Sequence, residues 1–148
     1  MADEQNITSG PEGSGVPELD FRILDSSMEI KAKGHVFIFN IPTSRQIAAI
    51  GIRARKLRME DFPGSDGSEE GLGWFEASLY RAMATFEVLL KTSSDVRLFS
   101  EDGSGKPVVD SAKWGKEITT DYLLGVYEGY LKALDSFRDQ VDGSATAS

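Results

Sequence analysis

The chain has 148 residues, a net charge of −8 and no cysteine. A domain of this length buries about two-thirds of the surface that its unfolded chain exposes, so its folding requires neither a metal nor a disulfide. The absence of cysteine excludes disulfides, thiolate metal sites and cysteine nucleophiles. The negative charge disfavours nucleic acid as a partner, because phosphate contacts need clustered positive charge. No apolar run is long enough to predict a membrane span, so a membrane is not an expected partner either.

Composition divides the chain into three parts. Residues 1–17, MADEQNITSGPEGSGVP, are rich in Gly, Ser, Pro and acidic residues and contain no Lys or Arg. Such a segment cannot bury enough apolar surface to fold, so we predict a disordered acidic arm. Residues 18–140 are predicted to form a single α+β domain. Residues 141–148 are predicted to form a disordered tail.

Alternating apolar residues predict β-strands at the start of the domain. Apolar and polar residues alternate over 19–23 and again over 28–31, and a β-branched and aromatic run covers 35–41. This period of two is typical of half-buried strands. Asp25-Ser26-Ser27 and Lys33-Gly34 supply turn residues between the runs. We therefore predict a small antiparallel β-meander of two or three strands.

Three main helices are predicted to follow this meander. Pro42 ends the last strand and Thr43 or Ser44 caps the first helix, whose apolar face includes Ile47, Ile50, Gly51, Ala54 and Leu57. A second amphipathic pattern extends from about Leu72 to Lys91, and a third extends from Thr119 or Thr120 to about Arg138. Between the first two helices, EDFPGSDGSEEGLG at 60–73 predicts a flexible acidic loop. Residues 96–99 are expected to form a short strand or an extended segment.

No catalytic, metal or cofactor site is predicted from these residues. His35 is the only histidine, and its place at the start of a strand favours a structural role over a catalytic triad or a metal site. The GSGK sequence at 103–106 lacks the Ser or Thr that a phosphate-binding loop needs after its lysine. The acidic residues at 60–73 lack the spacing of a calcium loop. We therefore expect a protein that is not an enzyme.

The first helix carries the one candidate site, a set of basic residues in an acidic chain. We predict that they bind a partner: Arg45, Arg53, Arg55, Lys56 and Arg58. The alternative is a solvated helix face, where basic residues near the C-terminal end of a helix interact favourably with its dipole. If the set binds, an acidic segment is the expected ligand, and it could come from a partner protein, from another copy of this chain or from residues 1–17.

The order of these segments resembles that of the tail assembly chaperones of long-tailed bacteriophages. The resemblance begins with GHVFIFNIPTSRQIAAIGIRARKL at 34–57, a strand that leads through Ile-Pro-Thr into a helix with Arg at two positions and a closing Leu. It continues with ASLYRAMATFEVLLKTSSD at 77–95. Trp114 and DYLLGVYEGYLKALDSFR at 121–138 complete it. Together these blocks cover roughly residues 19–140.

The resemblance implies a non-enzymatic function in virion assembly. Proteins of this family bind the tape measure protein, keep it soluble and help to recruit tail tube protein subunits. The implied location is the host cytoplasm, with no cofactor, and a homo-oligomer is left open. The alternative interpretation is a structural virion protein, either a capsid decoration protein, a head–tail connector or a tail completion subunit, because such proteins also use small α+β folds with disordered arms.

Overall fold

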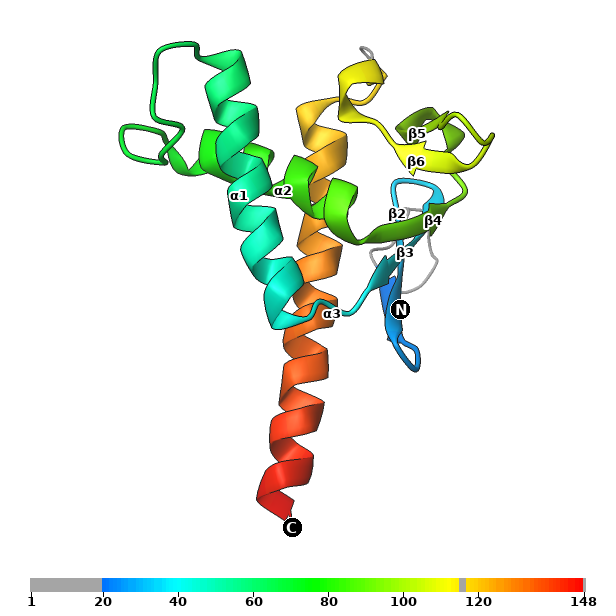
Figure 1. Ribbon diagram of the computed structural model, residues 1–148. Coiled ribbons are helices and arrows are strands. Elements are labelled where there is room, and N and C mark those ends of the chain that lie inside the picture. The colour runs from blue at the N-terminus through cyan, green and yellow to red at the C-terminus, as the bar shows by residue number, and fades with distance from the viewer. Residues whose placement is uncertain (1–19, 115–116, 148) are drawn as a thin grey trace, which may run out of the picture.

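The computed structural model describes residues 20–114 and 117–147, with side chains described as far as Val141. It confirms an α+β fold with three α-helices (Figure 1). The predicted arm at 1–17 lies outside the described residues. The main sheet is antiparallel with strand order β1-β2-β3-β4, and its strands are β1 (Asp20–Ile23), β2 (Ser27–Ala32), β3 (His35–Asn40) and β4 (Leu90–Ser93).

The predicted meander of two or three strands is therefore smaller than the observed sheet of four strands. Strands β1 to β3 follow each other as expected, with Met28 opposite Phe39 and Ile30 opposite Phe37. The chain then forms α1 (Ser44–Asp61) and α2 (Trp74–Leu89) before β4 returns to pair with β3. We expected residues 90 and 91 to end the second helix, because Leu89 and Leu90 continue its apolar stripe. Pairing with β3, more than fifty residues earlier in the chain, overrides this local pattern.

A small second sheet connects β4 to the last helix. It pairs β5 (Phe99–Glu101) with β6 (Pro107–Val109), and two short 3-10 helices, η1 (Val96–Leu98) and η2 (Ser111–Lys113), flank it. An extended segment was expected at 96–99, but residues 96–98 form a 3-10 helix and residue 99 begins β5. Helix α3 (Thr120–Ala147) then crosses the molecule, and its end projects past the rest of the fold (Figure 1). The end that we predicted for this helix, near Arg138, is too early.

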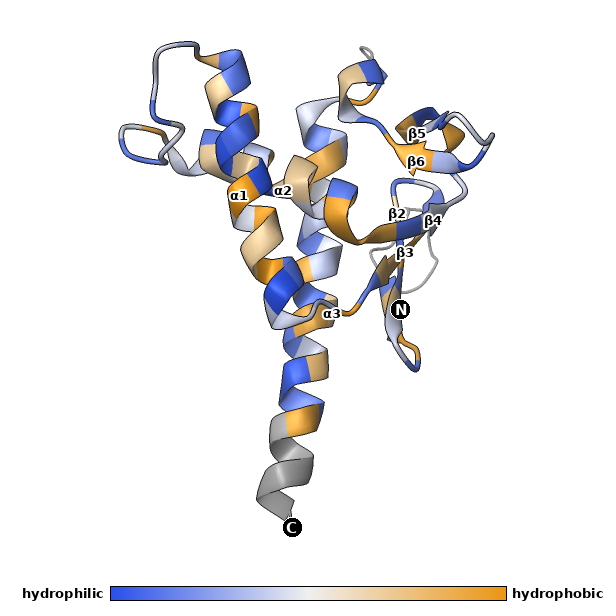
Figure 2. Cartoon of the chain, viewed as in Figure 1, coloured by the Kyte–Doolittle hydropathy of each residue, from blue (hydrophilic) through white to orange (hydrophobic). Residues whose placement is uncertain are grey.

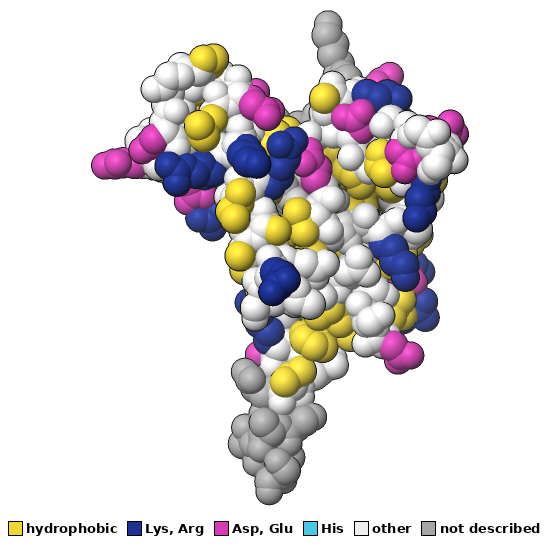
Figure 3. All heavy atoms as spheres, viewed as in Figure 1, with side chains coloured by type: hydrophobic (Ala, Val, Ile, Leu, Met, Phe, Trp, Pro, Cys, Tyr) yellow, Lys and Arg dark blue, Asp and Glu magenta, His cyan; other side chains and the backbone are white. Residues whose placement is uncertain are grey.

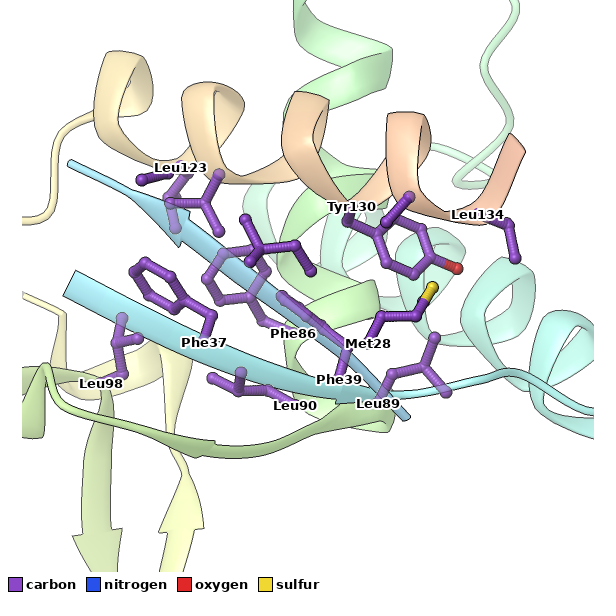
Figure 4. Packing of buried hydrophobic residues seen from close by; sticks show 14 of the residues in the cluster. Met28, Phe37, Phe39, Phe86, Leu89, Leu90, Leu98, Leu123, Tyr130 and Leu134 are labelled. Atoms are coloured by element: carbon purple, nitrogen blue, oxygen red, sulfur yellow. The ribbon is translucent and has the colours of Figure 1, made fainter. Parts of the chain in front are cut away.

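The main core lies between the sheet and helices α2 and α3. Figure 4 shows Phe37, Phe39 and Met28 on the sheet facing Phe86 of α2 and Tyr130 of α3. Phe39 contacts Phe86 edge to face, with ring centroids 5.3 Å apart, a favoured arrangement for aromatic pairs. The end of α2 and the start of β4 are coloured as strongly hydrophobic in Figure 2, which agrees with their burial in this core.

Helix α1 packs beside α2 through a smaller apolar cluster. Its start is fixed by a capping box, in which Thr43 and Gln46 bind each other's backbone N–H groups. Ala54 and Leu57 then pack against Tyr80 and other α2 residues. Helices α1 and α3 run in opposite directions on the two sides of α2 (Figure 1). The surface between α1 and α3 is hollowed into an open furrow.

Candidate functional site

Arg53, the first of the clustered basic residues on α1, is used within the fold. Its guanidinium group donates to both carboxylate oxygens of Glu87 on α2, and this hydrogen bonding raises the pKa of Arg53. Glu87 also accepts a hydrogen bond from the Ser111 hydroxyl in η2. Arg53 therefore connects α1 to α2 and, through Glu87, to the segment before α3.

Arg55 and Arg58 hold the acidic loop at 60–73. The Nε of Arg55 donates to the carbonyl oxygen of Asp66 at 2.7 Å, and the Nε of Arg58 donates to that of Gly67 at 2.5 Å. Gly67 is buried with a φ of +74°, and a Cβ atom there would lie 2.6 Å from the Arg55 carbonyl oxygen. A segment of this chain thus occupies part of the predicted basic surface. The flexibility of the loop stays a prediction.

The five predicted side chains do not converge on one site. Arg45 and Lys56 are exposed and lie on the side of α1 opposite the furrow, as the helical period requires. Neither forms an ion pair with another residue of the described ranges. Figure 3 shows basic side chains spread over α1 and interspersed with apolar ones, with acidic side chains of the following loop nearby. Of the five, Arg58 lines the furrow between α1 and α3 together with apolar residues. The binding role of the set stays a prediction.

The furrow between α1 and α3 is an open groove with a volume of about 430 Å³. We call it the α1–α3 groove. Ile47 and Leu131 stand on opposite walls with exposed fractions of 48% and 42%, which are high for side chains of this size. The lining residues are Ile47, Ile50, Gly51, Ala54 and Arg58 of α1, Glu69 of the loop, Arg81 and Thr85 of α2, and Tyr127, Tyr130, Leu131, Leu134 and Arg138 of α3.

One end of this groove contains a guanidinium group with one unsatisfied nitrogen atom. Arg81 binds both carboxylate oxygens of Glu69, and these hydrogen bonds lower the pKa of Glu69. Arg58 is only 6% exposed. Its Nη1 atom lies 3.7 Å from Glu69, which is too long for a hydrogen bond, and has no hydrogen-bond partner. Buried polar atoms of this kind are rare, because an unpaired N–H costs free energy.

A second polar cluster joins the sheet to α3 and was missed from the sequence. Asp95 is 2% exposed and accepts hydrogen bonds from the Arg97 guanidinium, at 2.6 and 2.8 Å, and from the Tyr122 hydroxyl. The Arg97 hydrogen bonds hold the pKa of Asp95 well below its usual range. His35 lies beside this cluster, with its Nδ1 atom 3.0 Å from the Ser94 hydroxyl.

His35, Ser94 and Asp95 are the residue types of a catalytic triad, which needs only one histidine. Their geometry differs from that of a triad. The Nε2 atom of His35 lies 3.9 Å from Asp95, which is beyond hydrogen-bonding distance. Arg97 and Tyr122 already occupy the carboxylate oxygens. Asp95 therefore does not orient the imidazole as the acid of a triad does.

Other types of site receive no support from the described residues. Over 20–114 and 117–147, no group of three or more His, Cys, Asp and Glu side chains is placed to hold a metal ion. None of the helices in these ranges combines the length and the hydropathy needed to cross a bilayer. Comparison with protein-family models, curated proteins and solved structures finds no match to this chain. The α1–α3 groove is the candidate site because half-exposed apolar side chains line its walls and a buried guanidinium nitrogen at one end has no partner.

Proposed function

We propose that this protein is a tail assembly chaperone of a long-tailed bacteriophage. In this role it binds the tape measure protein, keeps it soluble and helps to recruit tail tube protein subunits in the host cytoplasm. The proposal combines the resemblance in segment order with one observation, the open apolar groove between α1 and α3. No catalytic step is part of it.

The groove has the properties of a site for an amphipathic helix. Such helices place their apolar faces into apolar grooves, with contacts at every third or fourth residue. Ile47 and Leu131 are each about half exposed, and covering the exposed part of such a side chain contributes about 1 kcal/mol. The resemblance implies a long helical partner with many apolar faces. The net charge of −8 would help to keep a complex with it in solution.

Solubility of the partner tests this function. The tape measure protein of the same phage would be co-expressed with wild type, with Ile47→Asp or with Ile52→Asp, and its soluble fraction measured after centrifugation. Ile52 is the matched control, because it is also an exposed isoleucine of α1, at 60%, but does not line the groove. Wild type and Ile52→Asp should keep the partner soluble, whereas Ile47→Asp should not. Equal solubility with both variants would contradict docking in this groove.

The alternative function, a structural virion protein, is favoured by one feature. The end of α3 projects past the rest of the fold (Figure 1), in a position where a neighbouring subunit can contact it. Mass spectrometry of mature particles and of the lysate from the same infection distinguishes the two functions. A chaperone should be abundant in the lysate and missing from particles. A fixed copy number in each particle would instead identify a decoration, connector or tail completion subunit.

A further inference from the structure

We propose that the α1–α3 groove selects helical segments that carry carboxylates at both ends of a short apolar face. Arg58 and Arg81 would bind the carboxylate at one end, and Arg138 would bind the one at the other. This inference rests on the part of the proposed function in which the groove holds a partner helix. It does not depend on that partner being a tape measure protein.

The geometry of the groove sets the length of the segment. On α1 the lining extends from Ile47 to Arg58, and on α3 it extends from Tyr127 to Arg138. With a rise of 1.5 Å per residue, each wall is about 16 Å long, which is three helical turns. Because α1 and α3 run in opposite directions (Figure 1), Arg58 and Arg138 lie at opposite ends of the groove.

Charge and hydrogen bonding favour carboxylates at these ends. Three arginines and one glutamate line the groove, an excess of positive charge in a chain whose net charge is −8. The hydrogen bonds of Glu69 go to Arg81, so the buried Nη1 of Arg58 is left without an acceptor. A partner carboxylate at this end would supply one through a charge-assisted hydrogen bond.

Gly51 gives an independent indication that another chain approaches α1. It lies in the interior of the helix and lines the groove, and a Cβ atom there would meet nothing within 4 Å. Glycine in a helix interior costs about 0.5–1 kcal/mol relative to alanine. Neither its backbone conformation nor its packing requires this cost in the free protein. Close approach of a partner helix to α1 at this position would explain it.

Two designed peptides test the selection. Both are fluorescein-labelled 14-residue amphipathic helices with one leucine face and glutamine elsewhere. One carries a glutamate pair at each end and the other a lysine pair at each end, so interactions with the helix dipole are balanced within each peptide. Binding to the full chain is measured by fluorescence anisotropy at low and high salt.

Two variants lie in the groove, Gly51→Phe and Arg138→Glu. Their matched controls, Ala48→Phe and Arg45→Glu, make similar changes on exposed parts of α1 outside it.

The glutamate peptide should bind wild type at least about tenfold more tightly than the lysine peptide at low salt, with a smaller ratio at high salt. Gly51→Phe should weaken its binding by about tenfold or more, because the new ring fills the groove, whereas Ala48→Phe should not. Arg138→Glu should reduce the preference several-fold. Arg45→Glu should leave it close to that of wild type, because its charge lies outside the groove.

Several results would overturn the inference. They are equal binding of the two peptides, no binding of either, and an equal loss of preference in Arg138→Glu and Arg45→Glu. A wild-type dimer in sedimentation that Gly51→Phe dissociates would assign the groove to a second copy of this chain. Failure of the proposed chaperone function can be distinguished from failure of this inference. Selective peptide binding without solubilisation of the tape measure protein would refute only the chaperone function, whereas solubilisation that depends on Ile47 but no peptide preference would refute only the selection.

Discussion

Gly67 is the residue on which the conformation of the acidic loop most depends. It is buried beneath α1 with a φ of +74°, and a Cβ atom would lie 2.6 Å from both the Arg55 carbonyl oxygen and the Met59 Cγ. We expect Gly67→Ala to lower the free energy of unfolding by about 3 kcal/mol, because backbone strain and a steric clash add together. Urea denaturation followed by circular dichroism measures this change.

Gly64 provides the matched control for this prediction. It also has a positive φ, +93°, but a Cβ atom there would meet nothing within 4 Å. Gly64→Ala should therefore cost only the backbone strain, about 1 kcal/mol. Equal losses for the two variants would show that the contacts of Gly67 with α1 add nothing to stability.

The sequence predicts the charge of the α1 side chains but not their contacts. Four basic residues at 53–58 are evident from the sequence alone. Whether Arg55 and Arg58 meet solvent, a partner or their own loop depends on the path of that loop. This path depends on glycines at 64, 67 and 71, which all adopt a positive φ. Several glycines in a loop indicate that it can turn, but not where its carbonyl groups will lie.

At the scale of elements, local patterns predict most of the strands and helices. Alternation identified β1 to β3, and apolar residues at helical spacing identified α1, α2 and most of α3. Strand β4 was missed because its first residue also suits the helix before it, and only pairing with β3 settles its conformation. Local periodicity contains no information on such distant pairing.

Gly51 allows a prediction about the stability of one element, helix α1. Alanine is a better helix former than glycine, and a Cβ atom at this position meets no neighbour. Gly51→Ala should therefore raise the free energy of unfolding of the free protein by about 0.5–1 kcal/mol, measured by thermal or urea unfolding. Gly105→Ala is a suitable contrast, because its φ of +81° makes the same substitution unfavourable in the turn between β5 and β6. A loss of stability in Gly51→Ala would indicate that α1 has contacts there that the described structure lacks.

At the scale of the whole molecule, the groove depends on how the helices are placed relative to one another. Its lining comes from α1, α2, α3 and the acidic loop, which are separated along the chain. The residues facing it include the same apolar positions that local analysis assigns to the core, such as Ile47 and Leu131. Sequence periodicity identifies an apolar face but not how much of it the rest of the fold will cover. A groove of this kind therefore could not be predicted from the sequence.

The attachment of α3 to the sheet should make the whole fold sensitive to acid. Asp95 follows β4 and binds Tyr122 near the start of α3, so its carboxylate connects the two layers. Hydrogen bonds from Arg97 hold its folded-state pKa below the ordinary value of 3.8. A carboxyl group with a lowered folded-state pKa stabilises the fold fully above its unfolded-state pKa. This contribution is lost as the pH falls from about 4 through the folded-state pKa.

Replacing Asp95 with asparagine tests this connection. We expect Asp95→Asn to lower the free energy of unfolding at pH 7 by about 3 kcal/mol, because Arg97 and Tyr122 lose a buried anionic acceptor. The difference from wild type should shrink as the pH falls below about 4, because Asp95 of the unfolded wild-type chain then binds a proton that the folded protein does not yet bind. Urea denaturation from pH 7 to pH 2 measures both curves, and Asp139→Asn on the exposed surface of α3 controls for the loss of one negative charge. Parallel curves for wild type and Asp95→Asn would show that protonation of Asp95 does not limit the acid stability of the fold.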